Sequence, residues 1–391
     1  MAGVRCSAVN VVNIMMALIA DETDGRAPES VCSDALSDEM LTALYRLSKS
    51  HDLAHLVGDV LIQNGLIPNQ EIRAKFEKQM MMAIFRYEQI NYELNRLREA
   101  FNQAEIPFIP LKGAVIRKYY PQPWMRTSCD IDILVHEADL ERAVSLLTGT
   151  LAYREDSKGA HDVGLYAESG VHLELHYCLS EDASDGILDS VWERCTPLAD
   201  LPFCHVMPDD LFYYYHIAHM AKHFQIGGCG VRPFVDLRML NRCHDADRAG
   251  RQALLETGGL AAFSDAVNRL SAVWFDGETH TDLTRQMEQF LLSGGVYGTT
   301  ENRVTVQQVK KGGKFRYAIS RIWLPYEELK FHYPSLEGKR YLLLFYEIRR
   351  WGKLIFCGGA KRSVRELKLN AATSKDDRDS TTDMLIGLGL K

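Results

Sequence analysis

Hydrophobic residues recur at helical spacing along the first hundred residues of the chain. Between 69 and 104 the apolar positions fall three, four or seven residues apart, which predicts one long amphipathic helix ending before Pro107. The apolar run 9–20 is interrupted by Asn10 and Asn13. We therefore interpret it as a helix with one buried face rather than a signal peptide or a membrane span, and we expect an N-terminal helical region over 1–89.

The pattern then changes from helical spacing to short apolar runs and alternation. The stretches 106–110 and 129–135 are short and apolar, which predicts strands, and 138–147 returns to helical spacing. Residues 163–177 alternate on both sides of a glycine-containing turn, which predicts a β-hairpin. Strand and helix in turn indicate a mixed α/β core over 90–180, with a small mixed sheet flanked by helices.

Two aspartates lie inside the second of these strands. Asp130 and Asp132 are two residues apart, so on a strand they share one face, whereas Ile131 and Ile133 point to the opposite face. Paired carboxylates are the ligands that Mg²⁺ prefers, and such a pair can bridge two ions in phosphoryl or nucleotidyl transfer. For an isolated Asp-x-Asp the alternative is an edge strand with a solvated polar face.

A possible phosphate-binding turn precedes the aspartates. Gly113 follows the strand 106–110 and precedes the helix-like segment 115–120, so its backbone can approach a phosphate closely at a helix N-terminus. Lys112 adds a positive charge beside it.

A third carboxylate lies in the hairpin. His172, Glu174 and His176 share one face of the strand 171–177, opposite three apolar residues. Glu174 is therefore a candidate to join Asp130 and Asp132.

Together these residues resemble the bacterial uncharacterised nucleotidyltransferase family within the polymerase-β-like nucleotidyltransferase superfamily. The resemblance covers roughly two thirds of the chain and is most specific between 106 and 177. The positions that carry it are Leu111-Lys112-Gly113, Arg126, Asp130-Ile131-Asp132 and Leu173-Glu174-Leu175-His176, with looser likeness over 216–236 and 323–351.

The resemblance implies transfer of a nucleoside monophosphate from an NTP such as ATP to an acceptor hydroxyl or phosphate. In that reaction Asp130 and Asp132 would be catalytic and would bridge two Mg²⁺ or Mn²⁺ ions. Glu174 would complete the second metal site or draw the proton from the attacking group.

The resemblance also implies residues that bind the nucleotide. Lys112 and Gly113 would cradle the triphosphate, and Arg126 would neutralise charge on the leaving pyrophosphate. The chain departs from the superfamily's common pattern, because Lys-Gly-Ala stands where Gly-Ser or Gly-Gly is usual. Sixteen residues separate Gly113 from Asp130, which predicts an elaborated loop carrying Arg117, Lys118 and Arg126.

The remainder of the chain reads as helical. We expect a helical domain over 181–298, a basic helical region over 299–370, and disorder over 371–391. Residues 301–391 contain 19 Lys and Arg against 10 Asp and Glu, although the whole chain has a net charge of −7. A basic C-terminal third can attract a polyanion, but solvated helix faces explain each single cluster equally well.

The cysteines argue for a reducing compartment. There are nine, an odd number, and no two form a Cys-x-x-Cys pair. That content fits neither a disulfide framework nor a zinc ribbon, and we expect a cytoplasmic protein.

Two side-chain groups lie outside the core. His216, His219 and His223 fall on one stripe of a predicted helix, and we expect packing or lining of an acceptor cleft, with zinc binding a minor alternative. Arg232 and Asp236 are four residues apart and predict a helical ion pair, unless Arg232 reaches a phosphate.

The segment 339–356 mixes apolar and basic residues at helical spacing. A basic amphipathic helix can lie on a membrane surface as a peripheral contact. Docking onto its own protein is the commoner arrangement and is what we expect here.

Two further functions remain open from the sequence. One is a toxin-like nucleotidyltransferase that modifies tRNA, which the basic C-terminal third favours and the overall acidity opposes. The other is a catalytically silent nucleotide-binding module, which the three intact carboxylates oppose. The sequence does not identify the acceptor, which could be a small molecule, a glycan, a peptide or a tRNA, nor the oligomeric state.

Overall fold

The computed structural model describes residues 2–28, 36–179, 186–295, 298–356 and 360–391, without the side chains of 2–10, 331, 354–356 and 360–362. The chain forms two compact units. The first contains Met1–His219 and Val231–His280, and the second contains Met220–Gly230 and Thr281–Lys391.

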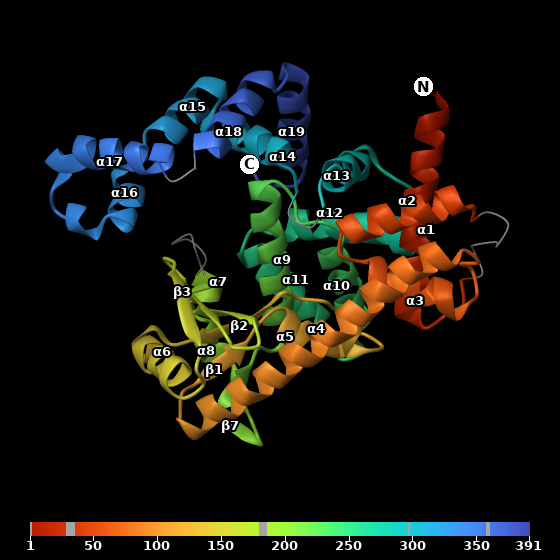
Figure 1. Ribbon diagram of the computed structural model, residues 1–391, viewed down its shortest axis with the longest axis horizontal. Coiled ribbons are helices and arrows are strands. Elements are labelled where there is room, and N and C mark those ends of the chain that lie inside the picture. Colours follow the sequence, from red (N-terminus) through yellow and green to blue (C-terminus); the bar gives the residue numbers. More distant parts are fainter. Residues whose placement is uncertain (1, 29–35, 180–185, 296–297, 357–359) are drawn as a thin grey trace. The chain divides into compact units, whose positions relative to one another are not determined.

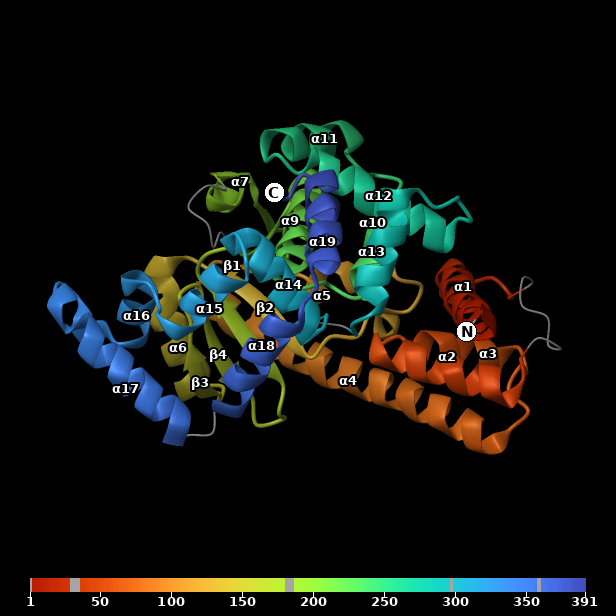
Figure 2. The ribbon, with the colours of Figure 1, turned by 90° about the horizontal axis from the view of Figure 1, so that it is seen from above.

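Four helices begin the first unit: α1 (Ala2–Asp24), α2 (Asp38–Ser50), α3 (Ala54–Gln63) and α4 (Gln70–Gln103). The sequence prediction of one long helix is confirmed by α4, whose N-terminus is capped by Asn69 accepting from the backbone N–H groups of Glu71 and Ile72. Figures 1 and 2 show α4 lying along α2 and α3 at one end and beside the strands at the other. The helix therefore connects the N-terminal helices to the sheet.

The central element is a seven-stranded mixed sheet with the order β3-β4-β5-β2-β1-β7-β6. The strands β2 and β5 are parallel neighbours, as are β1 and β7, whereas β1 and β2 are antiparallel. The predicted hairpin is confirmed as the antiparallel pair β4 and β5. The bounds are β1 (Phe108–Pro110), β2 (Asp130–Val135), β3 (Arg154–Lys158), β4 (Asp162–Tyr166), β5 (His172–His176), β6 (Thr196–Leu198) and β7 (Leu201–Val206).

One face of the sheet is apolar and covered by helices. Ile131 and Ile133 of β2 and Leu173 and Leu175 of β5 are buried in one cluster with side chains of α4 and of α6 (Leu140–Gly149). The alternation of the sequence produces this division, since the residues between them face the other side. The expected fold class, a small mixed sheet flanked by helices, is confirmed.

The sequence missed part of the sheet. We expected helix throughout 181–298, but β6 and β7 lie in that segment, and β7 pairs with β1 about a hundred residues earlier in the chain. Pro197 and Pro202 are visible as helix breaks, whereas the pairing depends on a distant strand. The five predicted domain boundaries themselves stay predictions.

The first unit is completed by short segments and helices. Between and after the strands lie α5 (Gly113–Ile116), η2 (Arg117–Tyr119), η3 (Pro123–Met125), η4 (Glu137–Asp139), α7 (Gly186–Asp189), α8 (Val191–Arg194), α9 (Asp209–Ile226), α10 (Arg232–Asn241), α11 (Arg248–Thr257) and α12 (Ala261–Phe275). Only the part of α9 up to His219 belongs to this unit.

The second unit is helical where it is described. Its elements after α9 are α13 (Asp282–Leu292), α14 (Thr300–Lys311), α15 (Lys314–Ile322), α16 (Tyr326–His332), η5 (Pro334–Leu336), η6 (Arg340–Leu342), α17 (Leu343–Phe356), α18 (Ala360–Ala372) and α19 (Lys375–Gly387). Among the described residues, no helix is both long and apolar enough to cross a membrane.

The C-terminal segment 371–391, for which we predicted disorder, contains the helix α19. Ser374 and Asp377 form a reciprocal capping box at the start of α19, and Met384 and Leu385 are buried. The long polar stretch between the cap and these apolar residues hides the helix from a hydrophobic pattern search.

Candidate active site

The three carboxylates predicted from the sequence lie on two adjacent strands. Because β2 and β5 are parallel and in register, Asp132 pairs with Glu174 and Asp130 pairs with His172. Residues two apart on a strand share a face, so all three carboxylates lie on the face opposite the apolar core. Asp132 and Glu174 are thus cross-strand neighbours, whereas Asp130 shares their face but does not belong to the group whose ligand atoms lie within 4.8 Å of one another. The catalytic role of all three stays a prediction.

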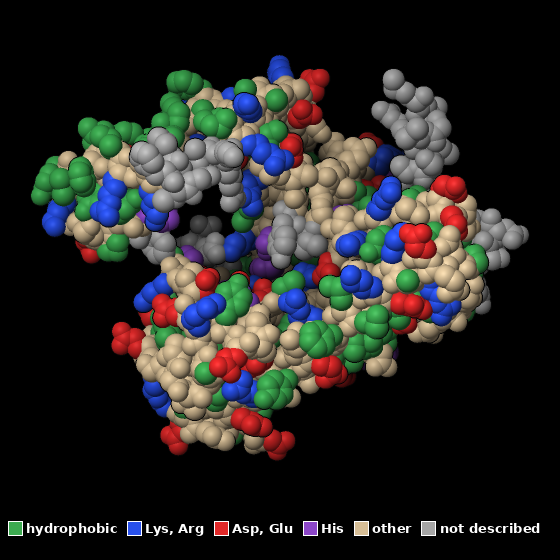
Figure 3. Space-filling view, viewed as in Figure 1, with side chains coloured by type: hydrophobic (Ala, Val, Ile, Leu, Met, Phe, Trp, Pro, Cys, Tyr) green, Lys and Arg blue, Asp and Glu red, His purple; other side chains and the backbone are tan. Residues whose placement is uncertain are grey.

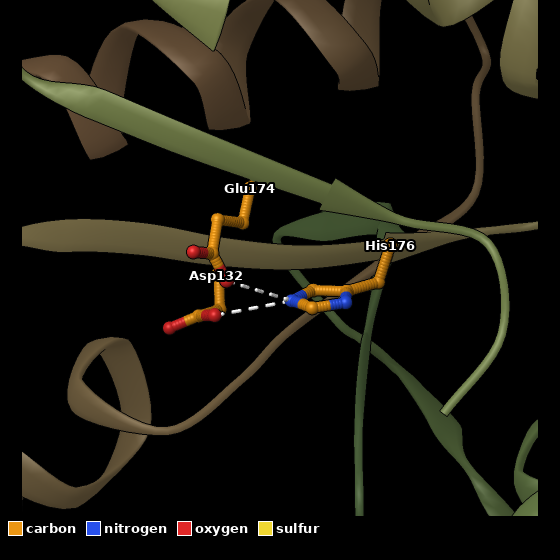
Figure 4. A group of neighbouring side chains, drawn as sticks. All are labelled: Asp132, Glu174 and His176. Carbon is orange, nitrogen blue, oxygen red and sulfur yellow. Dashed lines mark hydrogen bonds and ion pairs between the residues drawn. The ribbon is translucent and has the colours of Figure 1, made fainter. Parts of the chain in front are cut away.

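A histidine that the sequence analysis did not select joins the carboxylates. Nε2 of His176 lies 3.1 Å from Oδ1 of Asp132 and 3.5 Å from Oε2 of Glu174 (Figure 4). One ligand atom from each of these three residues lies within 4.8 Å of the other two. Among the residues that the structure describes, this is the one group with the geometry of a metal site, and it does not include His216, His219 or His223. The strand alternation had already placed His176 on the face of Glu174, but no role was assigned to it.

The ammonium group of Lys112 lies among the same oxygens. Its Nζ is 2.7 Å from Oδ1 of Asp132 and 3.9 Å from Oε2 of Glu174. Although burial opposes the ionisation of Asp132, Lys112 and His176 hold the pKa of its carboxyl well below its usual range. The side chain at the strand end therefore turns into the site rather than into solvent.

Asp130 is in a different electrostatic position from Asp132. Burial, followed by the charges of Asp132 and Glu174, raises the pKa of the Asp130 carboxyl. Lys112 and Arg232 oppose this shift without cancelling it. Asp130 is thus a partly buried carboxylate whose ionised form is disfavoured until a further positive charge arrives.

Burial also opposes the charged form of His176, but its hydrogen bonds to Asp132 and Glu174 outweigh that effect and raise the pKa of the imidazole to about 9. The imidazole is therefore protonated at neutral pH when no metal is bound. A metal ion would have to displace this proton before Nε2 could become a ligand. We therefore define the acid cluster as Asp130, Asp132, Glu174 and His176.

Gly113 lies at the turn where the sequence predicts it, but the strained backbone is that of the preceding residue, Lys112. Gly113 begins α5 directly after the turn from β1, as predicted. The left-handed backbone is at Lys112, with φ of 42°, which is unfavourable for a residue with a side chain. Gly113 is required for space, because a Cβ there would lie 3.2 Å from Cβ of Ser128.

A buried arginine supports this turn. Arg117 donates from Nε to the carbonyl of Gly113 at 2.7 Å and from Nη2 to Oγ of Ser128 at 3.1 Å. Its Nη1 is buried and has no hydrogen-bond partner among the described residues. Burial, followed by the charge of Arg126, lowers the pKa of Arg117 to about 10. This unsatisfied donor beside the predicted phosphate turn favours an anion there.

Arg126 is part of a buried ion pair. Its Nε lies 2.7 Å from Oδ1 of Asp236, and the hydroxyl of Tyr120 donates to the same oxygen at 2.7 Å. The expected helical pair between Arg232 and Asp236 is therefore wrong: Asp236 is bound by a residue from a distant part of the chain. Arg232 instead contacts Oδ2 of Asp52 at 2.9 Å and the carbonyl of Thr127 at 3.3 Å.

The first part of α9 places a buried tyrosine, Tyr215, within electrostatic range of the site. Burial raises the pKa of the Tyr215 hydroxyl far above its usual range, and Lys112, Asp132 and Glu174 are the next influences on it. His216, its neighbour, is buried and bonds through Nε2 to the carbonyl of Pro233 at 3.0 Å. His216 therefore packs, whereas Tyr215 lies within electrostatic range of the acid cluster.

The arrangement suits a divalent cation and a phosphorylated ligand. Carboxylate oxygens are hard ligands that Mg²⁺ and Mn²⁺ prefer. Lys112 and His176 place their positive charges at Asp132, and the pKa of the Asp130 carboxyl remains raised. Lys112, Arg117 and Arg232 place positive charge around the same face. Phosphoryl and nucleotidyl transfer require both features.

Comparison with known proteins places the chain in a family. Neither the curated proteins nor the solved structures include a match to this chain. A family model described as an uncharacterised nucleotidyltransferase matches residues 37–276, which include the whole sheet and the acid cluster. Because this match covers more than half of the 391 residues, the chain belongs to the uncharacterised nucleotidyltransferase family.

Proposed function

We propose that the protein transfers a nucleoside monophosphate from an NTP to an acceptor hydroxyl or phosphate and releases pyrophosphate. The observation that carries this proposal is the convergence of Asp130, Asp132 and Glu174 from two adjacent parallel strands. The family match supports nucleotidyl transfer, and the strand-turn-helix at Gly113 supports placement of the core in the polymerase-β-like superfamily. A silent nucleotide-binding copy would be expected to lack one of the carboxylates.

The acid cluster would hold the metal. Asp132, Glu174 and deprotonated His176, whose ligand atoms lie within 4.8 Å of one another, would hold a divalent cation, and Asp130 on the same face of β2 would add a further carboxylate. The divalent cations would neutralise the triphosphate and favour ionisation of the attacking hydroxyl. The raised pKa of Asp130 fits this assignment, since the carboxylate is short of positive charge without a metal.

Lys112 would change partners when the nucleotide and its cation bind. Its ammonium group now occupies a position between Asp132 and Glu174, where a cation would also be attracted. Release from these oxygens would let it contact the triphosphate beside Gly113. The predicted phosphate contact of Lys112 is therefore part of the proposal, together with the unsatisfied Nη1 of Arg117.

We assign Arg126 a smaller role than the resemblance implies. Its guanidinium is bound to Asp236, but its charge still influences Asp130 across the site. Arg232 is the better placed arginine for the leaving pyrophosphate, because it is partly exposed and its charge acts directly on Asp130. We propose that Arg126 stabilises the loop while Arg232 stabilises charge on the leaving group.

The chemical step balances as an in-line displacement. The acceptor oxygen forms a bond to the α-phosphorus, the bond from that phosphorus to the bridging oxygen breaks, and pyrophosphate leaves with the electron pair. The acceptor proton would pass to the carboxylate of Glu174 or to water. Tyr215 is close enough to act on the same charges, and we propose that it positions Lys112.

Labelled nucleotides test the proposal. Each NTP is supplied separately with label at the α- or the γ-phosphate, together with Mg²⁺ and a cell extract split into RNA, protein, glycan and small-molecule fractions. We expect the α-label to become covalently attached in one fraction while the γ-label leaves as pyrophosphate, and we expect the Asp132→Asn variant to give neither. Transfer of the γ-label to an acceptor would show a kinase instead and would overturn the proposal.

A further inference from the structure

The helix α17 has an apolar face that its own unit leaves uncovered. Tyr341, Leu344, Phe345 and Ile348 fall at i, i+3, i+4 and i+7, so they share one side of the segment that leads into and along the helix. All four are exposed: the exposed fractions are 80% for Tyr341 and 64% for Ile348. Single exposed apolar residues are ordinary, whereas a contiguous row of large ones indicates a binding surface.

The opposite side of α17 packs against its own unit and holds the helix in place. Tyr346 is buried in a cluster with Leu329 and Leu336, and Leu342 and Leu343 pack against that cluster. The sequence prediction that this segment docks onto its own protein therefore holds for one side of the helix only. The exposed row is not required to hold α17 in place.

The neighbouring helix α15 repeats the pattern. Phe315, Ile319, Ile322 and Trp323 lie on one face of it and at its end, and Phe315 is 78% exposed. Three hydrogen bonds join this helix end to α17: Nη2 of Arg350 and Nε1 of Trp351 donate to the carbonyl of Ile322, and the N–H of Leu324 donates to Glu347. These bonds hold the end of α15 against α17, and we name the two exposed rows together the α15–α17 face.

Basic residues flank these rows. Lys339, Arg340, Arg349 and Lys353 are exposed along the segment that contains the apolar row of α17, and Arg316 and Arg321 are exposed on α15. From 312 to 353 the chain contains nine Lys and Arg against four Glu and no Asp. Figure 3 shows hydrophobic and basic side chains interspersed over this part of the second unit.

This combination distinguishes between anionic partners. A nucleic acid is bound mainly through its phosphates, so it needs the basic residues but gains little from exposed Leu344, Ile348 and Ile319. An anionic lipid surface uses both, because aliphatic and aromatic side chains enter the headgroup boundary while Lys and Arg remain at the phosphates. The aliphatic content of the α15–α17 face therefore favours a membrane.

We propose that the α15–α17 face binds reversibly to an anionic phospholipid membrane. The helices would lie in the plane of the interface, without crossing the bilayer. This proposal does not depend on nucleotidyl transfer, and it assigns the basic C-terminal region a role that the active site does not supply.

Vesicle sedimentation with the full-length protein tests the proposal. Vesicles of phosphatidylcholine alone are compared with vesicles that also contain phosphatidylglycerol. We expect the protein to sediment with the second kind only and to be released by added salt, because the electrostatic part of the attraction is screened.

Two variants separate the apolar and basic contributions. Phe345→Asp combined with Ile348→Asp should abolish sedimentation, since it places charge in the row that enters the lipid. Lys339→Glu combined with Lys353→Glu should weaken binding by about fivefold or more for each residue changed. Both pairs lie in the second unit, whereas the acid cluster lies in the first. Circular dichroism and the melting temperature check that each variant folds.

A matched control uses the first unit. Met81 and Phe85 on α4 have the same 64% exposed fraction as Ile348, so Met81→Asp combined with Phe85→Asp adds the same two charges at similarly exposed apolar positions. We expect this variant to bind vesicles as the unchanged protein does. Equal loss in the control would show that the effect is not specific to α17 and would contradict the proposal.

Three other results would overturn the proposal. The first is no sedimentation with anionic vesicles. The second is a dimer, seen by light scattering, that Phe345→Asp with Ile348→Asp converts to a monomer, since the face would then bind a second copy of the chain. The third is loss of RNA binding in the Lys339→Glu and Lys353→Glu variant while vesicle binding is unchanged.

Discussion

The acid cluster of the first unit and the α15–α17 face of the second depart from ordinary packing in opposite ways. At the acid cluster, carboxylates are withdrawn from solvent and Asp130 lacks enough positive charge nearby. On the α15–α17 face, large apolar side chains are left in solvent. Charges normally stay in water and large apolar rows normally do not, so each region is incomplete without a ligand of the missing kind.

The two regions also differ in how far other residues of the protein neutralise the buried charge or cover the exposed apolar side chains. Lys112 and His176 contact Asp132, so its charge is compensated within the chain. Such preformed charge is typical of a site where small displacements cost activity. The apolar rows need no fixed geometry, because a lipid surface adapts to them. The difference indicates chemistry in the first unit and attachment in the second.

The largest expected effect is loss of transfer on changing the central carboxylate. Asp132→Asn keeps the shape of the side chain but removes the charge that would hold a metal, and the rate should fall about a thousandfold or more. Asp156→Asn, on the exposed strand β3, is the matched control and should leave the rate unchanged. The rate of pyrophosphate release measures both. A fully active Asp132→Asn variant would remove the acid cluster from the reaction.

The buried ion pair of Arg126 and Asp236 should affect the stability of the fold, whereas the carboxylates of the acid cluster should affect transfer. Asp236→Asn leaves the buried guanidinium of Arg126 without its partner, which should lower the free energy of unfolding by about 3 to 5 kcal/mol. Replacing both residues, as Arg126→Met with Asp236→Leu, should recover much of that stability. Urea denaturation decides the matter, and an unaffected single variant would show that the pair contributes little.

The space at the phosphate turn can be tested by giving residue 113 a side chain, either the methyl group of alanine or the larger isopropyl group of valine. A Cβ at position 113 meets Ser128 at 3.2 Å, so Gly113→Val should displace the turn and raise the apparent Km for NTP about tenfold, which is close to 1.4 kcal/mol. Gly113→Ala should have a smaller effect, and Ser128→Gly should relieve it. If a folded Gly113→Val variant binds NTP normally in equilibrium dialysis, the turn takes no part in binding.

The smallest expected effect has the opposite sign to the others. The folded-state pKa of Asp130 is raised, so its ionised form destabilises the metal-free protein once the pH rises through that pKa. Asp130→Asn should therefore increase the free energy of unfolding by about 1 kcal/mol at neutral pH in EDTA, with no gain below the usual pKa of a free aspartate. Added Mg²⁺ should stabilise the unchanged protein and not the variant. A loss of stability in EDTA would show that Asp130 is a structural residue.

Local alternation was enough to predict the centre of the site. Asp130, Asp132 and Glu174 were found because a strand divides its residues between two faces, and because the core side of β2 and β5 is consistently apolar. His176 followed the same alternation, although no role was given to it. The turn at Gly113 was recognised from the change between strand and helix.

Contacts between distant segments could not be predicted in this way. The pairing of β7 with β1, the bond from Arg126 to Asp236 and the approach of Tyr215 to Lys112 each join residues about a hundred positions apart. No periodicity within one segment contains that information. The helix α19 was missed for a local reason, since its stability depends on a capping box and two buried residues near its end.

The most direct test of the central claim is metal binding by the acid cluster. Mn²⁺, which has an electron paramagnetic resonance signal, is titrated into the protein with a non-hydrolysable NTP analogue, and the free ion is measured. We predict that the unchanged protein and the Asp156→Asn control bind Mn²⁺ with the nucleotide, and that Asp132→Asn leaves it in solution. Equal binding by the protein and by Asp132→Asn, or no binding by either, would contradict the assignment of these carboxylates as the metal site.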